Sequence, residues 1–313
     1  MFRFPVPDPK LMRDELQYLE CAGFDSVFLA DHPSLFPDPW VNLAGAADAT
    51  TTIRLGTLAS CVAYRHPAML ARVVADVDRV SGGRAVLGLG SGDMPGEFDM
   101  LGLTYGTAAP RRELLEQALR VMPSLLRGEP VTADGRSFVL RDTALGAPAV
   151  QQPFVPIAVA GGSRGTLRLA AQYADAINIG PAAWAGGAYS TDEVQDRFTV
   201  LDDFGADLGR SPGSVLRTGL IGLSIAATTD AAQAAVDAIP ADFREFFRGF
   251  FFAGTPDDTA RYLDRIIGSG YQYLVFLTAD MVFGSREMTE RLRADVLPQV
   301  RTRTRVTAEV RPR

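Results

Sequence analysis

The chain has 313 residues, 47% hydrophobic and 22% charged as in ordinary globular proteins, which excludes a disordered or fibrous protein. The net charge of −6 argues against a nucleic-acid-binding protein, because such proteins normally carry a basic face. Two cysteines, Cys21 and Cys61, cannot form a disulfide framework and the first residues do not resemble a signal peptide, so we expect a cytoplasmic protein.

Short apolar runs alternate with amphipathic stretches along the whole chain, which predicts strands alternating with helices. Strands are expected at residues 2–6, 24–30, 53–60, 84–90, 155–160, 175–179, 216–226 and 271–277. Helices are expected at residues 10–22, 41–49, 68–80, 111–126, 165–173, 192–208, 229–239, 255–267 and 285–300. The longest uncharged stretch, residues 143–163, contains prolines and glutamines, so we expect no membrane helix.

This order of elements has the length and rhythm of a (β/α)₈ barrel, and no linker divides the chain, so we expect a single domain over residues 1–313. A doubly wound parallel sheet has the same local alternation and stays open as an alternative. In both folds each strand is buried on two faces, as the apolar runs require.

Three segments interrupt the alternation and are predicted to be insertions. Residues 129–142 contain Asp134-Gly135, which indicates a hairpin, and residues 180–190 are rich in Gly, Pro and Ala and predict a loop. Residues 241–253 carry a run of phenylalanines that suggests an apolar lid, with a core-packed helix or a dimer contact as the alternatives. The tail after Arg301 is expected to be frayed.

Residues 161–165 fit the pattern G-x-S-x-G between a predicted strand and a predicted helix, as in a serine hydrolase. That chemistry requires a histidine after the serine, and both histidines, His32 and His66, precede Ser163. A second interpretation is an anion site suited to a phosphate, since glycines expose backbone amides and the helix N-terminus attracts negative charge. That site would use Gly161, Gly162, Ser163, Arg164 and Thr166. A plain turn with Ser163 as helix N-cap remains a third possibility.

Two further strand ends carry candidate residues. The run Gly88–Asp93 matches only half of a dinucleotide-binding fingerprint, but Gly90 and Gly92 would let a flat ligand approach the backbone. Asp31 and His32 follow the second strand, where a barrel histidine is well placed for proton transfer, although a structural hydrogen bond is the alternative. We expect no metal site, because the histidines and cysteines lack ligand spacing.

Several stretches together resemble the bacterial-luciferase-like family of flavin- and F420-dependent oxidoreductases. They are residues 23–32 (GFDSVFLADH), 53–57, 66–68 with 70–72, 78–92 (DRVSGGRAVLGLGSG), 156–162 with 166–175, 254–256 and 296–298. The resemblance runs through nearly the whole chain in the order typical of the family. It implies a luciferase-like (β/α)₈ barrel, usually a homodimer, with the cofactor ring at the C-terminal mouth.

The resemblance also implies roles for individual residues. Leu58, Ala59 and Ser60 match a bulge that often contains a non-prolyl cis peptide behind the ring. The loop of Gly161, Gly162, Ser163 and Thr166 matches the family's phosphate loop. Asp31 and His32 match a pair near the ring carbon that exchanges hydride, and Asp93 stands where some members place a glutamate as proton donor. Lysines that bind sugar phosphates in some members have no counterpart, because Lys10 is the only lysine.

The function implied is an F420-dependent oxidoreductase that transfers hydride between the deazaflavin and a small or medium-sized organic substrate, with His32 assisting proton transfer. The alternative is an FMN-dependent monooxygenase that uses O₂ and flavin reduced by a separate reductase. A barrel that has lost catalysis and only binds a ligand is the third hypothesis. The expected partners are a small-molecule substrate and a second copy of the chain.

Overall fold

Parallel strands form a barrel in the computed structural model, which describes residues 1–180, 190–241 and 247–301. Its eight described strands are β1 (Phe2–Arg3), β2 (Ser26–Leu29), β3 (Arg54–Thr57), β5 (Ala85–Gly90), β8 (Ile157–Ala160), β9 (Ala176–Asn178), β10 (Leu216–Ile225) and β12 (Tyr273–Thr278). They pair in chain order from β1 to β10, and β10 pairs with β12. The ring closes where β12 lies beside β1 and the Tyr273 hydroxyl hydrogen-bonds Ser26 Oγ at 2.7 Å. The (β/α)₈ fold is therefore confirmed, and the doubly wound alternative is excluded.

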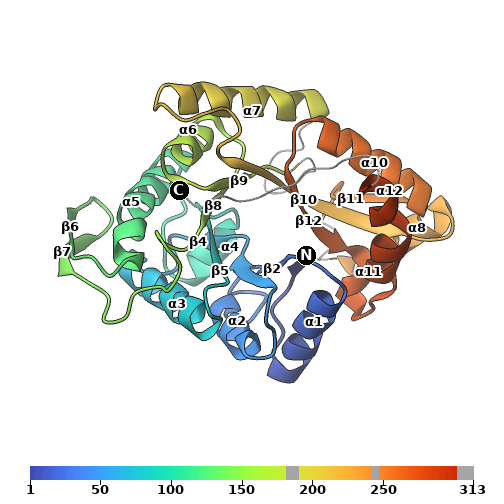
Figure 1. Cartoon of the computed structure of the whole chain (residues 1–313), viewed down its shortest axis with the longest axis horizontal. Coiled ribbons are helices and arrows are strands. Elements are labelled where there is room, and N and C mark those ends of the chain that lie inside the picture. The colour runs from blue at the N-terminus through green and yellow to red at the C-terminus, as the bar shows by residue number, and fades with distance from the viewer. Residues whose placement is uncertain (181–189, 242–246, 302–313) are drawn as a thin grey trace.

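Helices surround these strands, as Figure 1 shows. The main ones are α1 (Pro9–Cys21), α2 (Pro39–Ala47), α3 (Pro67–Val80), α5 (Ala108–Leu126), α6 (Arg164–Tyr173), α7 (Thr191–Ala206), α8 (Thr229–Asp237) and α10 (Pro256–Gly268). Several begin with proline after a capping side chain, because proline lacks the N–H that a helix start leaves unpaired. Asp8 and Asp38 cap α1 and α2, and His66 caps α3 by accepting the Ala68 N–H at 3.3 Å.

The third predicted insertion is partly wrong, because residues 251–253 belong to a strand. This strand, β11 (Phe251–Gly254), pairs in parallel with the end of β10, with Gly222 opposite Phe251. The cause is the length of β10. Strand β9 pairs only with Leu216–Thr218, at the start of β10, so the same edge of β10 has no partner from β9 beyond Thr218. An open edge inside a protein must find partners for its backbone groups, and β11 provides them.

The C-terminal helix is also interrupted where the sequence predicts one helix over residues 285–300. The structure has a 3₁₀ turn η1 (Ala279–Phe283), then α11 (Glu287–Arg291), a π-helical turn η2 (Leu292–Val296) and α12 (Leu297–Arg301). Pro298 has no N–H to donate to the carbonyl four residues earlier, and the irregular turn lies just before it. A short helix, α4 (Pro95–Met100), was not predicted.

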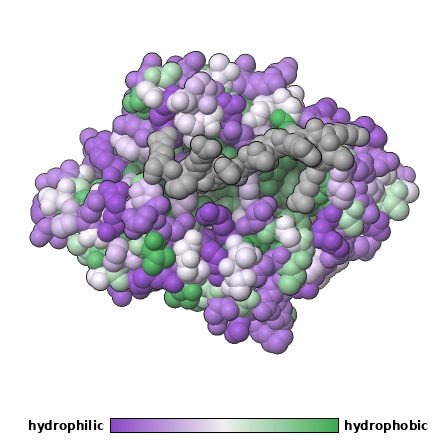
Figure 2. Space-filling view, viewed as in Figure 1, coloured by the Kyte–Doolittle hydropathy of each residue, from purple (hydrophilic) through white to green (hydrophobic). Residues whose placement is uncertain are grey.

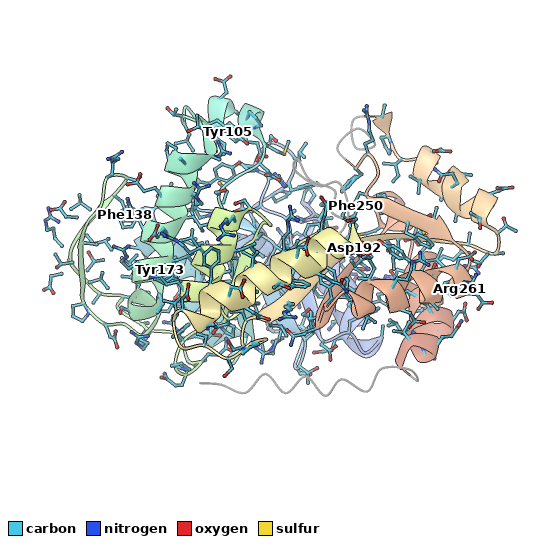
Figure 3. The ribbon with its side chains drawn as sticks, turned by 90° about the horizontal axis from the view of Figure 1, so that it is seen from above. Tyr105, Phe138, Tyr173, Asp192, Phe250 and Arg261 are labelled. Carbon is cyan, nitrogen blue, oxygen red and sulfur yellow. The ribbon has the colours of Figure 1, made fainter. Side chains whose placement is uncertain are left out.

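The first insertion forms the predicted hairpin. Strands β6 (Val131–Asp134) and β7 (Val139–Thr143) pair antiparallel. They project from the outside of the barrel beside α5, and Figure 3 shows Phe138 of the hairpin far from Phe250. Residues 181–189 of the second insertion, and the tail from residue 302, lie outside the described residues.

The barrel interior is filled by aromatic and aliphatic side chains. Phe28, Leu220 and Leu277 point inward from three different strands. They pack in one cluster with Phe247 and Phe250. The last two side chains are 3% and 2% exposed, so these phenylalanines of the third insertion are core residues. Phe243 and Phe246 lie outside the described residues. No described helix is long and apolar enough to cross a membrane.

Candidate functional site

A pocket of about 330 Å³ opens at the carboxyl ends of the barrel strands. Figure 2 shows the same face of the molecule, which is hollowed near its centre. The described residues that line the pocket are Asp31, His32, Leu58, Ala59, Cys61, Tyr64, Gly90, Ser91, Gly92, Asp93, Tyr105, Arg111, Ala160, Gly161, Gly162, Ser163, Thr166, Asn178, Gly180, Leu220 and Phe250. Most of the residues predicted from the sequence therefore meet in one place, although they come from separate strand ends.

His32 lies on one side of this pocket, held by a carboxylate that the sequence patterns do not single out. Its Nδ1 is 3.2 Å from Oε2 of Glu97, a residue of α4 whose side chain is only 1% exposed. The same carboxylate accepts hydrogen bonds from the Tyr64 hydroxyl at 2.6 Å and from the Ser34 hydroxyl at 2.7 Å. Glu97 thus ties His32 to two neighbouring loops.

The charges around His32 favour its protonated form. Burial lowers the pKa of His32, but the hydrogen bond to Glu97 and the charges of Asp93, Glu97 and Asp31 outweigh it, so the pKa is raised. For Glu97, burial raises the pKa, while the bonds from His32, Tyr64 and Ser34 lower it to about 2. These interactions favour the imidazolium form of His32 and the carboxylate form of Glu97.

Asp31 sits beside His32 in the chain, but its carboxylate is engaged elsewhere. Arg65 donates to both of its oxygens, at 2.6 and 3.2 Å, and also to Asp38 at 2.5 Å. Burial raises the pKa of Asp31, and the Arg65 contacts partly offset this. Asp31 therefore contributes a buried charge near His32, and Arg65 anchors it.

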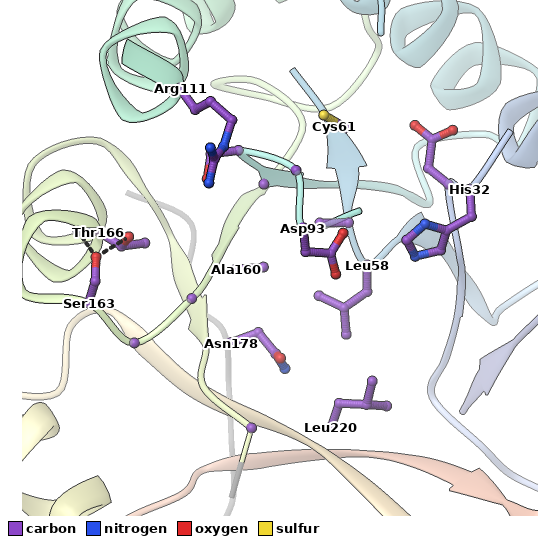
Figure 4. Close-up of a pocket in the computed structure, with 18 of the residues that line it drawn as sticks. His32, Leu58, Cys61, Asp93, Arg111, Ala160, Ser163, Thr166, Asn178 and Leu220 are labelled. Atoms are coloured by element: carbon purple, nitrogen blue, oxygen red, sulfur yellow. Dashed lines mark hydrogen bonds between the residues drawn. The ribbon is translucent and has the colours of Figure 1, made fainter. Parts of the chain in front are cut away.

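Asp93 and His32 point toward one another across the pocket in Figure 4. Asp93 follows Gly92, which has a φ of +84° and no room for a side chain, because a Cβ would lie 2.6 Å from the Phe98 ring. This turn directs the Asp93 carboxylate into the pocket. Cys61, also in the lining, is 4% exposed, and burial raises the pKa of its thiol to about 12.

The end of β3 carries the non-prolyl cis peptide that the resemblance implied, between Leu58 and Ala59. Both residues line the pocket. Ser60 does not: it is fully buried behind them, where it accepts the Trp40 Nε1–H at 3.0 Å and donates to Thr57 at 3.1 Å. Ser60 therefore supports the bulge from behind.

The glycine loop after β8 lies on the opposite side of the pocket from His32 (Figure 4). Gly161 has a φ of +126°, and Gly162 accepts a hydrogen bond from Arg197 of α7 at 3.1 Å. Ser163 is the N-cap of α6: its Oγ accepts the Thr166 N–H at 3.2 Å and lies 2.8 Å from the Thr166 hydroxyl. Both the turn and the exposed helix start that an anion site needs are present.

The cation beside this loop is not the one predicted. Arg164 lies with its guanidinium 4.9 Å from the ring centre of Phe204 and does not line the pocket. Arg111, at the start of α5, does line it, and stacks 3.6 Å over the Tyr105 ring while donating to the Gly106 carbonyl at 3.0 Å. Its Nε is buried and has no acceptor among the described residues.

The sequence signals for the missed residues were weak. Pro95 at a helix start with Glu97 in its first turn fits the pattern of a short helix, which could have indicated α4. For Tyr64, Arg65 and Arg111 the sequence contains no comparable signal. No group of three His, Cys, Asp or Glu side chains that could hold a metal ion occurs within residues 1–180, 190–241 and 247–301.

Comparisons with known proteins agree on one family. The family described as luciferase-like monooxygenase matches residues 5–280. A 4-hydroxyprotoasukamycin monooxygenase from Streptomyces nodosus subsp. asukaensis is 32% identical over 214 residues, covering 66% of this chain and 56% of that protein. An F420-dependent glucose-6-phosphate dehydrogenase from Beutenbergia cavernae is 27% identical over an alignment of 330 residues, covering 94% of this chain and 95% of that protein. The chain thus spans little more than half of the monooxygenase's length and nearly all of the dehydrogenase's.

A solved structure gives the same fold. Coenzyme F420-dependent tetrahydromethanopterin reductase from Methanopyrus kandleri matches with a TM-score of 0.79 at 18% identity, covering 96% of this chain and 98% of that one. At that identity the likeness shows the barrel fold alone.

Proposed function

The chain belongs to the luciferase-like monooxygenase family, and on that premise we propose that it is an F420-dependent oxidoreductase. It transfers hydride between the deazaflavin and a small or medium-sized organic substrate. The observation that carries this proposal is the imidazole of His32, which lines the pocket and is held by the buried Glu97. A histidine in this position is suited to the proton transfer that accompanies the making or breaking of a C–H bond.

The residues present fit a phosphate-bearing flat cofactor. Arg111 offers a buried Nε donor that has no acceptor among the described residues. Ser163 and the start of α6 offer hydroxyl and backbone donors a short way along the same wall. Gly90, together with Ala59 beyond it, leaves a surface without large side chains against which a planar ring can lie.

Bound F420 would supply the two-electron chemistry, as an acceptor or a donor of hydride. His32 would hold the proton that must move at the substrate: it accepts the hydroxyl proton of an alcohol as the carbonyl forms, and returns it in the reverse direction. Asp93, on the facing side, adds negative charge that stabilises the protonated imidazole. Leu220 and Phe250 give the pocket an apolar wall that excludes water.

The pocket chemistry favours a substrate without a phosphate group. Among its described lining residues there is no lysine, and Lys10 lies on α1, where it pairs with Asp14 at 2.6 Å in solvent. Arg111 serves the cofactor in this proposal. A neutral alcohol, ketone or related small molecule therefore suits the remaining space better than a sugar phosphate.

Cofactor binding tests the proposal directly. Purified protein titrated into oxidised F420 should quench its fluorescence saturably at micromolar protein, and a panel of alcohols should then bleach the absorbance of the bound deazaflavin. His32→Asn should bind F420 within a few-fold of the wild type but lose turnover. His66→Asn is the matched control, since His66 caps α3 away from the pocket and asparagine is a good N-cap. Absence of F420 binding would overturn the proposal.

An FMN-dependent monooxygenase is the second candidate, favoured by the 32% identity to a monooxygenase. It predicts that reduced FMN, and not F420, binds at micromolar protein. It also predicts oxygen uptake when a flavin reductase supplies the reduced cofactor. Titration of F420 and FMN under the same conditions decides between the two.

A further inference from the structure

The carboxylate of Glu97 has the hydrogen bonds that an ionised group needs at a buried position. It accepts from His32, from the Tyr64 hydroxyl and from both the hydroxyl and the backbone N–H of Ser34, at 2.6 to 3.2 Å. Its side chain is 1% exposed. An ionised carboxylate has no proton to donate, so each of these partners must be the donor in its hydrogen bond.

This arrangement fixes which nitrogen of His32 keeps its proton. We propose that Glu97 is a positioning residue that holds the proton on Nδ1 of His32, so that Nε2 is the nitrogen that exchanges a proton with the substrate. The identity of that substrate rests on the proposed function, but the positioning does not. Glu97 itself does not line the pocket, and it acts through the imidazole.

Other charged and titratable groups surround His32, and they differ from Glu97 in kind. They are Asp31, the preceding residue, Asp93 in the pocket lining, Cys61 of the short strand β4 (Ser60–Cys61), Tyr64 after that strand, and Arg65, which is paired with Asp31. Asp31 and Asp93 raise the pKa of His32 through their charges, and the Asp31 carboxylate is held by Arg65. Glu97 combines the charge with a direct bond to one nitrogen.

The second histidine of the chain provides an internal reference with the opposite arrangement. Nδ1 of His66 accepts the backbone N–H of Ala68, so its neutral ring carries the proton on Nε2. The sequence contains only these two histidines. Their ¹⁵N signals therefore distinguish the two tautomers in one spectrum, without cofactor or substrate.

The test is a pH titration of protein labelled with ¹⁵N-histidine, followed by long-range ¹H–¹⁵N correlation. Above its titration midpoint, His32 should show a protonated Nδ1 while His66 shows a protonated Nε2. In Glu97→Gln the amide oxygen can still accept from Nδ1 but has no charge. The tautomer should therefore persist, and the midpoint of His32 should fall by about one unit or more. The tautomer of His66 should stay unchanged. A protonated Nε2 on neutral wild-type His32, or an unmoved midpoint in the variant, would overturn the proposal.

Turnover provides the second readout. With F420 and substrate, the limb of the kcat profile that reports His32 should shift in Glu97→Gln by the same amount as the NMR midpoint, with KM little changed. Tyr64→Phe removes another bond to the same carboxylate without removing charge, and should keep the Nδ1 tautomer. If the protein shows no F420 turnover, the proposed function fails while the tautomer result still stands. If Glu97→Gln does not fold, the wild-type tautomer alone decides.

Discussion

Ser163 and His32 line the same pocket from opposite sides, and each is bonded to a different partner (Figure 4). The Ser163 hydroxyl lies 2.8 Å from Thr166, and Nδ1 of His32 lies 3.2 Å from Glu97. The G-x-S-x-G pattern therefore forms no serine–histidine pair. In the proposed function the two sides would act differently: the Ser163 side would offer donors to an anion, and the His32 side would hold a proton.

This division predicts that Ser163 is not a nucleophile. A serine hydroxyl needs a base within hydrogen-bond reach to attack an activated phosphonate, and here its neighbour is a threonine. A fluorophosphonate probe should therefore leave the protein unlabelled in intact-protein mass spectrometry, with a serine hydrolase as the positive control. A mass increase of one probe that disappears in Ser163→Ala would restore the hydrolase hypothesis.

Arg111, and not Arg164, should determine affinity for the phosphate of the cofactor. Replacing Arg111 by alanine removes the buried Nε donor, and a bond to a charged group contributes roughly 1.5–3 kcal/mol, so the Kd for F420 should rise about 10-fold or more. Arg164→Ala removes the same charge from a side chain stacked on Phe204 outside the pocket, and should change the Kd less than about three-fold at roughly 0.15 M salt. Fluorescence titration of both variants measures the difference. Equal losses in the two variants would contradict this assignment.

The barrel was predictable because the signals that specify it are local. Apolar runs, helix caps and turn residues recur along the chain, and Ser163 and His66 do cap the helices that follow them. The hairpin at residues 129–142 follows from Asp134-Gly135 in the same way. The cis peptide at Leu58–Ala59 was predicted only from the family resemblance, since no local pattern in the residues requires it.

The features that the sequence did not predict depend on contacts between distant segments. Glu97 is 65 residues from His32 in the chain, and nothing near either residue indicates the bond between them. Strand β11 forms because β10 continues beyond its pairing with β9, which is a property of the assembled sheet. Arg164 has the residue type of a phosphate ligand, but α7 places the Phe204 ring where its guanidinium stacks. Residue type therefore indicated which strand ends line the pocket, and packing decided which side chains reach it.

The close approach of β5 to the end of β3, which it pairs with in parallel, should tolerate no side chain at Gly88. A Cβ there would lie 2.0 Å from the Thr57 carbonyl oxygen, a backbone atom that cannot rotate away. Gly88→Ala should lower the free energy of unfolding by more than about 3 kcal/mol, or prevent folding. Gly45→Ala is the matched control: a Cβ on this exposed helical glycine would have no atom within 4 Å, so alanine should stabilise by about 0.5–1 kcal/mol. Urea unfolding of the soluble variants measures both, and a Gly88→Ala protein as stable as the wild type would contradict the geometry.

Acid should destabilise the fold through Glu97. Its pKa is lowered from 4.5 to about 2 in the folded chain, so the folded state binds fewer protons than the unfolded state between these values. The stabilisation is therefore present above pH 4.5 and is lost as the pH falls toward 2. From about pH 5.5 to about pH 3.0, this carboxylate should account for a loss of about 2 kcal/mol in the free energy of unfolding.

Two neighbours respond differently over that range, and a variant separates them from Glu97. Burial raises the pKa of Asp31, so its protonation on acidification favours the folded state and opposes the loss. His32, with a pKa raised above 6.5, is already protonated over this range and contributes a constant amount. Both are retained in Glu97→Gln, whose stability should therefore fall about 2 kcal/mol less than that of the wild type between about pH 5.5 and about pH 3.0. Urea unfolding at the two pH values gives this difference, and parallel losses in both proteins would show that folding does not lower the pKa of Glu97.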